Sequence, residues 1–414
     1  MIQKMDGGVT SARGFKAASC EAGIKYQNRR DMAMVWCETP CAVAGTFTSN
    51  KVKAAPVQWD RKIVESGNPV QAIVVNTGIA NAGTGPEGLR LCEETARCAG
   101  ETLNISPERV LIGSTGVIGP NIPLDRIQAG VRTLAGSLSG SREAATLAAK
   151  AIMTTDTVSK EAAVSFELPA AGGEGNVKVT LGGMSKGSGM IHPNMCTMLA
   201  YLTTDCAMDP ALLREAVKTV VTDTFNMITV DGDTSTNDTL LVLSSGLAGN
   251  AVITEKDGKY DLFLEALEAV CRDLAIQMAR DGEGASHLIE TRVIGADTKE
   301  NARILAKSVV GSSLVKARVF GKDANCGRVL CALGYAGPDF DPARITIHMT
   351  GEAGTVCFYQ DGCVQLFDEE KALEILSEKD IHFLCDMKMG NEEATAWGCD
   401  LTYDYVKING DYRT

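Results

Sequence analysis

Strand-like and helix-like patterns alternate along this chain, and no other sequence feature restricts the fold as much. Apolar runs at Gln71–Asn76 and Arg109–Ile112 predict buried strands, and each leads into a glycine-rich turn and then a helical pattern. In the first helical pattern Pro86 stands at the expected start, and Cys92 and Ala96 recur at helical spacing. Such alternation predicts a layered α/β protein.

The alternation continues toward the carboxyl end. Strands are expected at Val177–Leu181, Met198–Thr203 and Leu240–Ser244, and helices over 122–138, from Pro210 to about Phe225 and over Tyr260–Arg280. Asp209 is the expected N-cap of the Pro210 helix, Gly182-Gly183 an expected turn, and Asp361-Gly362 the expected turn of a hairpin. The polar stretch Asp297–Asn301 indicates a candidate boundary near residue 300, before a smaller subdomain.

Charge and hydropathy exclude several classes of protein. The 414 residues include 40 basic and 52 acidic side chains, for a net charge of −12. Nucleic-acid binding needs a basic cluster, and none is present. There is neither an apolar run long enough to span a membrane nor the apolar core of a signal peptide, so we expect a cytoplasmic protein.

The 14 cysteines are therefore expected to be reduced thiols. The closest pairs are Cys37/Cys41 and Cys326/Cys331, and no histidine lies near them at metal-ligand spacing. We expect buried apolar cysteines and no metal site.

The densest motif is residues 182–205, GGMSKGSGMIHPNMCTMLAYLTTD. Its glycines allow unusual backbone angles and a close approach to a ligand. The motif is not a phosphate-binding P-loop, because Lys186 precedes Gly187 instead of following a suitable glycine. On spacing alone, a structural glycine turn is the commoner explanation.

Residues 186–199, KGSGMIHPNMCTML, resemble the self-cleavage segment of the ornithine acetyltransferase family, the bifunctional glutamate N-acetyltransferases. The resemblance covers the whole chain. It extends to Gly7–Thr10, Gly14-Phe15, Ala22–Lys25, Phe47–Lys51, Ala54–Val57, Asn81-Ala82, Thr84–Pro86, Ser114–Gly116, Met153–Asp156, Asp231–Asp238, Gly282–Gly284 and the tail Asn409–Thr414. The chain departs from the family at Cys196, where alanine is usual, and at Ala324 and Cys326, where proline and tryptophan are expected.

The resemblance implies a layered α/β sandwich that cuts itself between Cys196 and Thr197. The products would be an N-terminal chain of residues 1–196 and a C-terminal chain of residues 197–414. The two chains are expected to stay associated, as a heterotetramer with two copies of each.

Cleavage would give Thr197 the base that its hydroxyl needs to act as a nucleophile. A threonine hydroxyl is a weak nucleophile and needs a neighbouring base. Attack of its Oγ on the Cys196 carbonyl, followed by hydrolysis, would release an α-amino group with a pKa of about 7.7–8.0. One residue would then carry both nucleophile and base. Without the resemblance, Thr197 would be read as an ordinary strand residue.

The resemblance also implies the residues around the nucleophile. Acyl transfer passes through an oxyanion, and Thr115 and Gly116 in GSTGVIG are assigned to stabilise it. Lys186 is suited to hold a substrate carboxylate. On spacing alone, Thr115 and Gly116 would be read as part of an ordinary turn and Lys186 as a solvated loop lysine.

The other implied substrate contacts are Glu283, Thr154, Asn409 and Thr414. Glu283, between two glycines, could bind the substrate amino group or move a proton. Thr155 is the alternative to Thr154, because the register is uncertain by one residue. Without the resemblance, Glu283 would be a surface carboxylate and Asn409 and Thr414 a frayed tail.

The implied reaction is ping-pong transfer of acetyl from N2-acetyl-L-ornithine to L-glutamate through acyl-Thr197, a step of arginine biosynthesis. No metal or prosthetic group is implied, and acetyl-CoA use as a second donor is left open. One alternative is a self-processing amidohydrolase or aminopeptidase with water as the acceptor. Another is a self-processed binding or structural protein.

Overall fold

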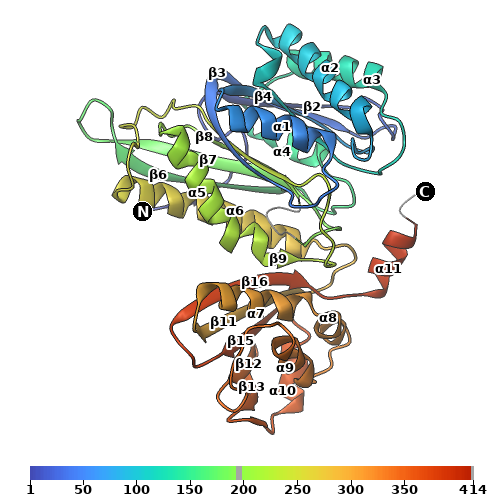
Figure 1. Ribbon diagram of the computed structural model, residues 1–414, viewed down its shortest axis with the longest axis vertical. Coiled ribbons are helices and arrows are strands. Elements are labelled where there is room, and N and C mark those ends of the chain that lie inside the picture. The colour runs from blue at the N-terminus through green and yellow to red at the C-terminus, as the bar shows by residue number, and fades with distance from the viewer. Residues whose placement is uncertain (193–197, 412–414) are drawn as a thin grey trace. The chain divides into compact units, whose positions relative to one another are not determined.

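The computed structural model describes residues 1–192 and 198–411, and the chain forms two compact units (Figure 1). Unit 1 consists of Met1–Gly187, Asn194–Phe225 and Thr234–Leu274, and unit 2 of Ser188–Pro193, Asn226–Asp233 and Ala275–Thr414. The chain therefore passes from unit 1 to unit 2 between Gly187 and Ser188, inside the motif that dominates the sequence.

Among the described residues, unit 1 holds a nine-stranded sheet with the order β1-β6-β7-β8-β10-β3-β4-β5 and β2 paired with β3. The strands are β1 (Gln3–Met5), β2 (Phe15–Cys20), β3 (Met32–Phe47), β4 (Val70–Asn76), β5 (Val110–Ser114), β6 (Lys160–Pro169), β7 (Asn176–Lys186), β8 (Leu199–Thr204) and β10 (Thr239–Ser244).

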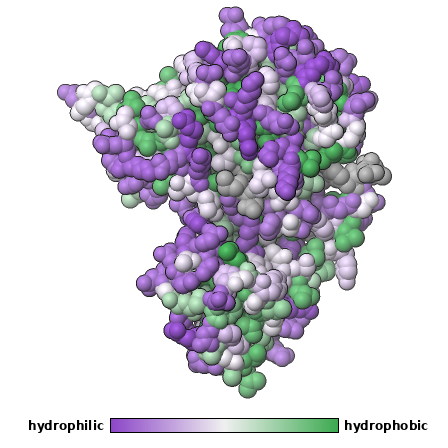
Figure 2. All heavy atoms as spheres, viewed as in Figure 1, coloured by the Kyte–Doolittle hydropathy of each residue, from purple (hydrophilic) through white to green (hydrophobic). Residues whose placement is uncertain are grey.

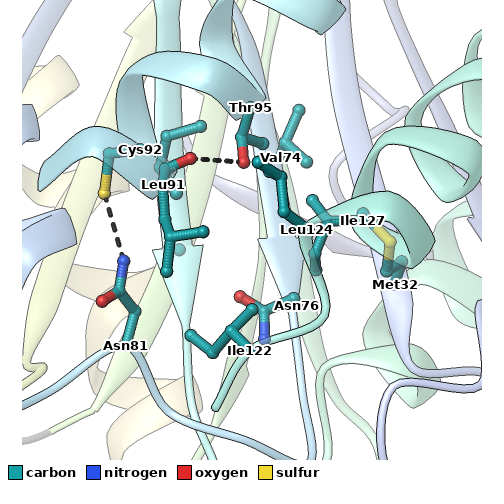
Figure 3. Close-up of a pocket in the computed structure, with 12 residues that line it drawn as sticks. Met32, Val74, Asn76, Asn81, Leu91, Cys92, Thr95, Ile122, Leu124 and Ile127 are labelled. Carbon is teal, nitrogen blue, oxygen red and sulfur yellow. Dashed lines mark hydrogen bonds between the residues drawn. The ribbon is translucent and has the colours of Figure 1, made fainter. Parts of the chain in front are cut away.

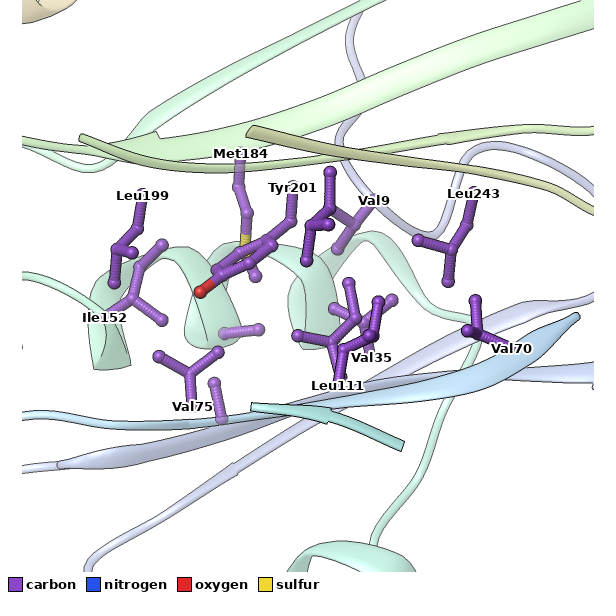
Figure 4. Close-up of a cluster of buried hydrophobic side chains, with 14 of the residues drawn as sticks. Val9, Val35, Val70, Val75, Leu111, Ile152, Met184, Leu199, Tyr201 and Leu243 are labelled. Carbon is purple, nitrogen blue, oxygen red and sulfur yellow. The ribbon is translucent and has the colours of Figure 1, made fainter. Parts of the chain in front are cut away.

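The long strand β3 belongs to two layers of this sheet. Its first half, Met32–Trp36, pairs with β2 and β4, and its second half, Ala42–Phe47, pairs with β10. Its register with β4 shifts between Trp36 and Cys41, which marks an irregularity where the strand leaves one layer for the other. The two halves of the sheet consequently face each other across a hydrophobic core (Figure 4).

Side chains from both layers fill that core. Figure 4 shows Met184 and Tyr201 pointing inward from one layer and Val75 and Leu111 from the other. All four are fully buried, and α4 (Arg142–Ala151) contributes alanines to the same cluster. Burying each large apolar side chain contributes about 1.5–3 kcal/mol, so this cluster is a main source of the unit's stability.

Helices cover the two outer faces of unit 1 (Figure 1). On the β2–β5 layer lie α2 (Gly85–Leu103) and α3 (Leu124–Gly136), and on the other layer lie α5 (Pro210–Asp223) and α6 (Gly258–Arg280), whereas α1 (Ala55–Ser66) contributes Val57, Ile63 and Val64 to the core between the layers. The short 3-10 helices η1 (Pro107–Arg109) and η2 (Phe225–Met227) precede β5 and β9. The predicted α/β layered sandwich is confirmed, and so is the Asp209 cap, whose Oδ1 accepts the Ala211 N–H at 2.7 Å.

The predicted turn at Gly182-Gly183 is wrong, because both glycines lie inside β7. Both glycines are needed because neighbouring segments of the chain pack closely against them. A Cβ on Gly182 would lie 2.2 Å from the carbonyl oxygen of Gly8, and one on Gly183 would lie 2.8 Å from the Leu202 side chain. The strand therefore runs on to Lys186 and delivers that residue to the end of the sheet.

Unit 2 holds a seven-stranded mixed sheet among its described residues, with the order β14-β13-β12-β15-β11-β16-β9. Its strands are β9 (Ile228–Thr229), β11 (Leu288–Ala296), β12 (Thr346–Gly351), β13 (Gly354–Gln360), β14 (Cys363–Val364), β15 (Asp380–Asp386) and β16 (Glu392–Cys399). Its helices are α7 (Lys299–Gly311), α8 (Ser313–Phe320), α9 (Gly327–Gly334), α10 (Glu369–Ile375) and α11 (Tyr403–Gly410).

The predicted hairpin in unit 2 is confirmed. Gln360 of β13 pairs with Cys363 of β14, and the two turn residues Asp361 and Gly362 have φ of 52° and 77°. Positive φ at both central residues is the requirement of a tight two-residue hairpin, and Asp-Gly meets it at low cost.

The surface of unit 1 that is visible in Figure 2 is mostly hydrophilic. The apolar side chains exposed in unit 2 include Tyr335, Val364, Leu366 and Leu373. Within residues 1–192 and 198–411, no helix combines the length and the hydropathy needed to cross a bilayer.

Candidate active site

The turn that follows β5 is held by the turn that follows β4. The Thr115 N–H donates to the Asn76 carbonyl at 3.1 Å, and the Val117 N–H donates to the Gly78 carbonyl at 3.1 Å. Gly116 has a φ of 129°, and a Cβ there would lie 2.3 Å from the Gly78 carbonyl carbon. Only glycine fits at this position, so the turn has a fixed shape.

Lys186, at the end of β7, connects this turn to the segment between α4 and β6. Its Nζ donates to Thr154 Oγ1 at 2.7 Å and to Thr115 Oγ1 at 3.4 Å, and the side chain is only 9% exposed. Three residues that the sequence nominated thus meet in unit 1. Thr154, the first choice of the Thr154/Thr155 pair, lies against the lysine.

Asp156 joins the same group and was not nominated from the sequence. Its carboxylate accepts the Lys160 Nζ at 2.6 Å, the Gly187 N–H at 2.7 Å and the Thr154 N–H at 3.1 Å. Burial alone would raise its pKa, but the positive charges of Lys186 and Lys160 and these hydrogen bonds lower the pKa to about 2. Asp156 is therefore a carboxylate at neutral pH. The sequence pointed to Asp156 only as the last residue of Met153–Asp156, one of the segments that resemble the family.

The residue that follows Thr197 is also anchored in unit 1. The Met198 carbonyl accepts the Thr239 N–H at 2.7 Å. The neighbouring Asp238 is buried; burial raises the pKa of its carboxyl well above the usual range, although hydrogen bonds from Ser235 and Thr48 oppose the shift. A buried acid therefore lies beside the start of β8.

In unit 2, Glu283 is held by backbone and by the last helix. Its N–H donates to the Ser188 carbonyl at 2.8 Å, and its carboxylate lies against Gly189, where a Cβ would come within 2.3 Å of the carboxyl carbon. Asn409 Nδ2, from α11, donates to Glu283 Oε2 at 2.7 Å. Two more of the nominated residues, Glu283 and Asn409, therefore meet, and Glu283 is only 7% exposed.

Cys196, Thr197 and Thr414 lie outside the described residues. Their predicted roles as cleavage bond, nucleophile and substrate contact stay predictions. The same holds for the division of the chain at residues 196/197 and for the candidate boundary near residue 300.

A small cavity lies beneath the β4 and β5 turns, on the side of α2 and α3 (Figure 3). Its volume is about 20 Å³, and Asn81 at its edge donates to Cys92 Sγ at 3.4 Å. This volume suits roughly one water molecule. The cavity therefore belongs to the packing beneath the turns and is too small for a substrate.

Comparison with known sequences identifies the family. A sequence model of the ArgJ family matches residues 16–414. The chain belongs to the ArgJ family. The resemblance found in the sequence is thereby confirmed.

Two relatives show how completely the chain matches the ArgJ family. The arginine biosynthesis bifunctional protein ArgJ of Symbiobacterium thermophilum is 52% identical over 100% of both chains, and that of Caldanaerobacter subterraneus is 47% identical over 100% of both. A solved ornithine acetyltransferase complexed with ornithine, from Mycobacterium tuberculosis, is 37% identical. It covers 47% of this chain and 99% of its own, with a TM-score of 0.42.

Proposed function

We propose that this chain is a self-cleaving acetyltransferase of arginine biosynthesis that moves acetyl from N2-acetyl-L-ornithine to L-glutamate. Membership of the ArgJ family supports this proposal, and so does the name of its 52% and 47% identical relatives. The single observation that carries the chemistry is the contact of buried Lys186 with Thr154 and Thr115. It places a cation beside a fixed turn that can serve an oxyanion.

The first step of the proposed mechanism is maturation. Thr197 Oγ attacks the Cys196 carbonyl, the C–N bond breaks as an ester forms, and water releases the Cys196 carboxylate and the Thr197 amine. The neutral amine then takes the proton of the same residue's hydroxyl during catalysis. No metal or prosthetic group enters this scheme.

The second step is acetyl transfer. Thr197 Oγ attacks the acetyl carbonyl of acetylornithine, the amide bond breaks, and ornithine leaves with the proton. The glutamate amine then attacks the ester and regenerates the hydroxyl. Because Lys186 already donates to Thr115 Oγ1, that hydroxyl can direct its own hydrogen to the oxyanion of each step.

Lys186 also suits both substrates, since each is an α-amino-acid derivative with a carboxylate. Its ammonium can hold the carboxylate of the donor and then that of the acceptor, as expected when one acyl-enzyme serves both. We assign Glu283 and Asn409 to the substrate amino group or its proton. Acetyl-CoA as a second donor is a separate activity that Thr197 acylation would also allow.

The two fragments should remain together after cleavage. β7 precedes the proposed cut and β8 follows it, and they are adjacent antiparallel strands paired from Leu181/Thr204 to Lys186/Leu199. β10, after the cut, pairs with β3, before it. Separation would break these ladders and expose the core between the layers, so we expect a stable pair and propose an assembly of two pairs.

Intact mass spectrometry with and without acetylornithine tests the proposal. We expect fragments of residues 1–196 and 197–414 and a burst of acetylation on Thr197. Thr197→Ala should stay uncut and inactive, whereas Thr197→Ser, which keeps a hydroxyl, should still be cut. A single 43.8 kDa chain with full activity would contradict the maturation step.

Product analysis then separates the transferase from its main rival. Labelled acetylornithine should deliver its acetyl group to glutamate, with parallel double-reciprocal lines as glutamate is varied. Label that appears only as free acetate at every glutamate concentration would replace the transferase with a hydrolase that uses water.

A further inference from the structure

The segment before the proposed cleavage bond has an unusual backbone that needs support. Met190 has a φ of 55°, in the left-handed region that residues other than glycine adopt rarely. Its side chain is 46% exposed, so packing of that side chain does not hold the conformation in place. Such a conformation costs about 1–3 kcal/mol and persists only where surrounding contacts fix it.

Asp231 supplies those contacts from within unit 2. Its Oδ2 accepts the Met190 N–H at 2.6 Å, and its Oδ1 accepts the Ile191 N–H at 2.9 Å. One carboxylate therefore binds two consecutive amides. Hydrogen bonds to an ionised acceptor are shorter and about twice as strong as those between neutral groups.

Two further contacts fix the direction in which the chain leaves this point. The Val230 N–H donates to the Ile191 carbonyl at 2.6 Å, and His192 Nδ1 lies 2.9 Å from Thr229 Oγ1. Ile191 itself is buried. Residues 190–192 thus run alongside residues 229–231, and His192 is four residues from Cys196 in the chain.

Asp231 also receives a contact from α11. The Tyr405 hydroxyl donates to Asp231 Oδ2 at 3.3 Å, and the same helix carries Asn409, the donor to Glu283. Asp231, which binds the backbone of Met190 and Ile191, is therefore also connected to α11, the helix whose Asn409 contacts Glu283.

We propose that Asp231 is a positioning residue for self-cleavage, which fixes the Met190–His192 arm that leads to the proposed cleavage bond. This inference rests on the proposed function, of which maturation is a part. It assigns a role to a residue outside the nominated site. Intramolecular attack is very sensitive to geometry, and a displacement of about 1 Å can cost roughly 100-fold in rate.

Removal of the charge tests the inference in the full-length chain. In Asp231→Asn, the amide can present N–H to the two backbone N–H groups, so we expect self-cleavage to slow by about 10- to 100-fold. The rate is read from intact mass in a time course after synthesis. Asp233→Asn, the same change at an exposed residue two positions away, is the matched control and should be cut at the parent rate.

Substitutions at Met190 approach the same arm without a change of charge. Valine is β-branched and tolerates a positive φ poorly, so Met190→Val should slow cleavage as Asp231→Asn does. Met190→Gly, which adopts this φ without penalty, should be cut at the parent rate. Added to Asp231→Asn, glycine should restore part of the lost rate, which a general loss of folding would not allow.

Activity per cleaved chain completes the test. Once cut, Asp231→Asn should retain kcat within about threefold of the parent. Cleavage of Asp231→Asn and Met190→Val at the parent rate would overturn the positioning role, and so would slow cleavage without any rescue by glycine. If the parent chain itself is never cut, the proposed maturation fails instead, so the two failures can be told apart.

Discussion

Asp156 and Asp60 are two buried carboxyl groups of unit 1 with opposite behaviour. Asp156 accepts hydrogen bonds from Lys160, Gly187 and Thr154, and the nearby lysine charges overcome the effect of burial and lower its pKa to about 2. Asp60, in α1, accepts the Ile112 N–H at 2.8 Å, and burial raises its pKa well above the usual range. Within the described residues its Oδ2 has no hydrogen-bond partner.

The comparison shows what distinguishes a charged site from a buried acid that is merely tolerated. Burial disfavours both carboxylates, and only cations placed beside one of them reverse the effect. Those cations include Lys186, which touches Thr154 and Thr115. The ionised Asp156 therefore belongs to the neighbourhood of the proposed site, while Asp60 belongs to the packing of α1 against β5.

Among substitutions that test the contrast between Asp156 and Asp60, Asp156→Asn should have the largest effect on stability and activity. It leaves Lys160 buried without its counter-charge, which costs about 3–5 kcal/mol of folding free energy. It also withdraws the carboxylate that holds Gly187 and Thr154. We expect a strong fall in urea resistance together with a loss of transferase activity of at least 100-fold.

The double variant Asp156→Asn/Lys160→Gln separates these two effects. Replacement of both partners of a buried ion pair can be nearly neutral for stability. Urea resistance should largely return, while activity should stay low because Lys186 still lacks its anion. Recovery of both properties would mean that Asp156 acts only through the fold.

Lys186→Met should have the next largest effect, and mainly on substrate binding. A charge-assisted contact with the substrate carboxylate contributes about 1.5–3 kcal/mol. We expect kcat/KM to fall by about 10- to 150-fold for acetylornithine and for glutamate alike, with a smaller loss of stability than in Asp156→Asn because Lys160 still pairs with Asp156. A loss confined to one substrate would refute a shared carboxylate subsite.

The sequence predicted much of this fold, since apolar periodicity and turn chemistry are local signals. The strand at Gln71–Asn76, the Asp209 cap and the Asp361-Gly362 hairpin are all of this kind. The turn at Gly182-Gly183 failed for a non-local reason. These glycines make room for Gly8 and Leu202, which are distant in the sequence.

The site shows the same division. The resemblance to a family nominated Thr115, Thr154 and Lys186, and the structure adds that they touch. It could not assign Asp156 a role, because a buried carboxylate is recognised by the lysines around it, and one of them, Lys186, lies 30 residues away. The sequence could not assign Asp231 a role either, because its partners are backbone N–H groups, which every residue except proline carries.

Asp60→Asn should have the smallest effect on activity, and its effect on stability should have the opposite sign. The folded-state pKa of Asp60 lies above its unfolded value, so the folded protein binds the extra proton and loses stability as pH rises above about 4. The slope can reach about 1.4 kcal/mol per pH unit until the folded-state pKa is passed. Asparagine has no proton to lose and keeps the acceptor that meets Ile112, so it removes this slope.

Melting temperatures from pH 2 to pH 8 would reveal this difference. Asp60→Asn should match the parent near pH 4 and become increasingly more stable than the parent toward pH 7, at unchanged activity. For Asp156 the sign is reversed. Its folded-state pKa is depressed, so its contribution is present above pH 4 and is lost between about pH 4 and pH 2, and Asp156→Asn should converge with the parent there. Parallel profiles for Asp60→Asn and the parent would mean that Asp60 is ionised in the folded protein, and the contrast between the two acids would disappear.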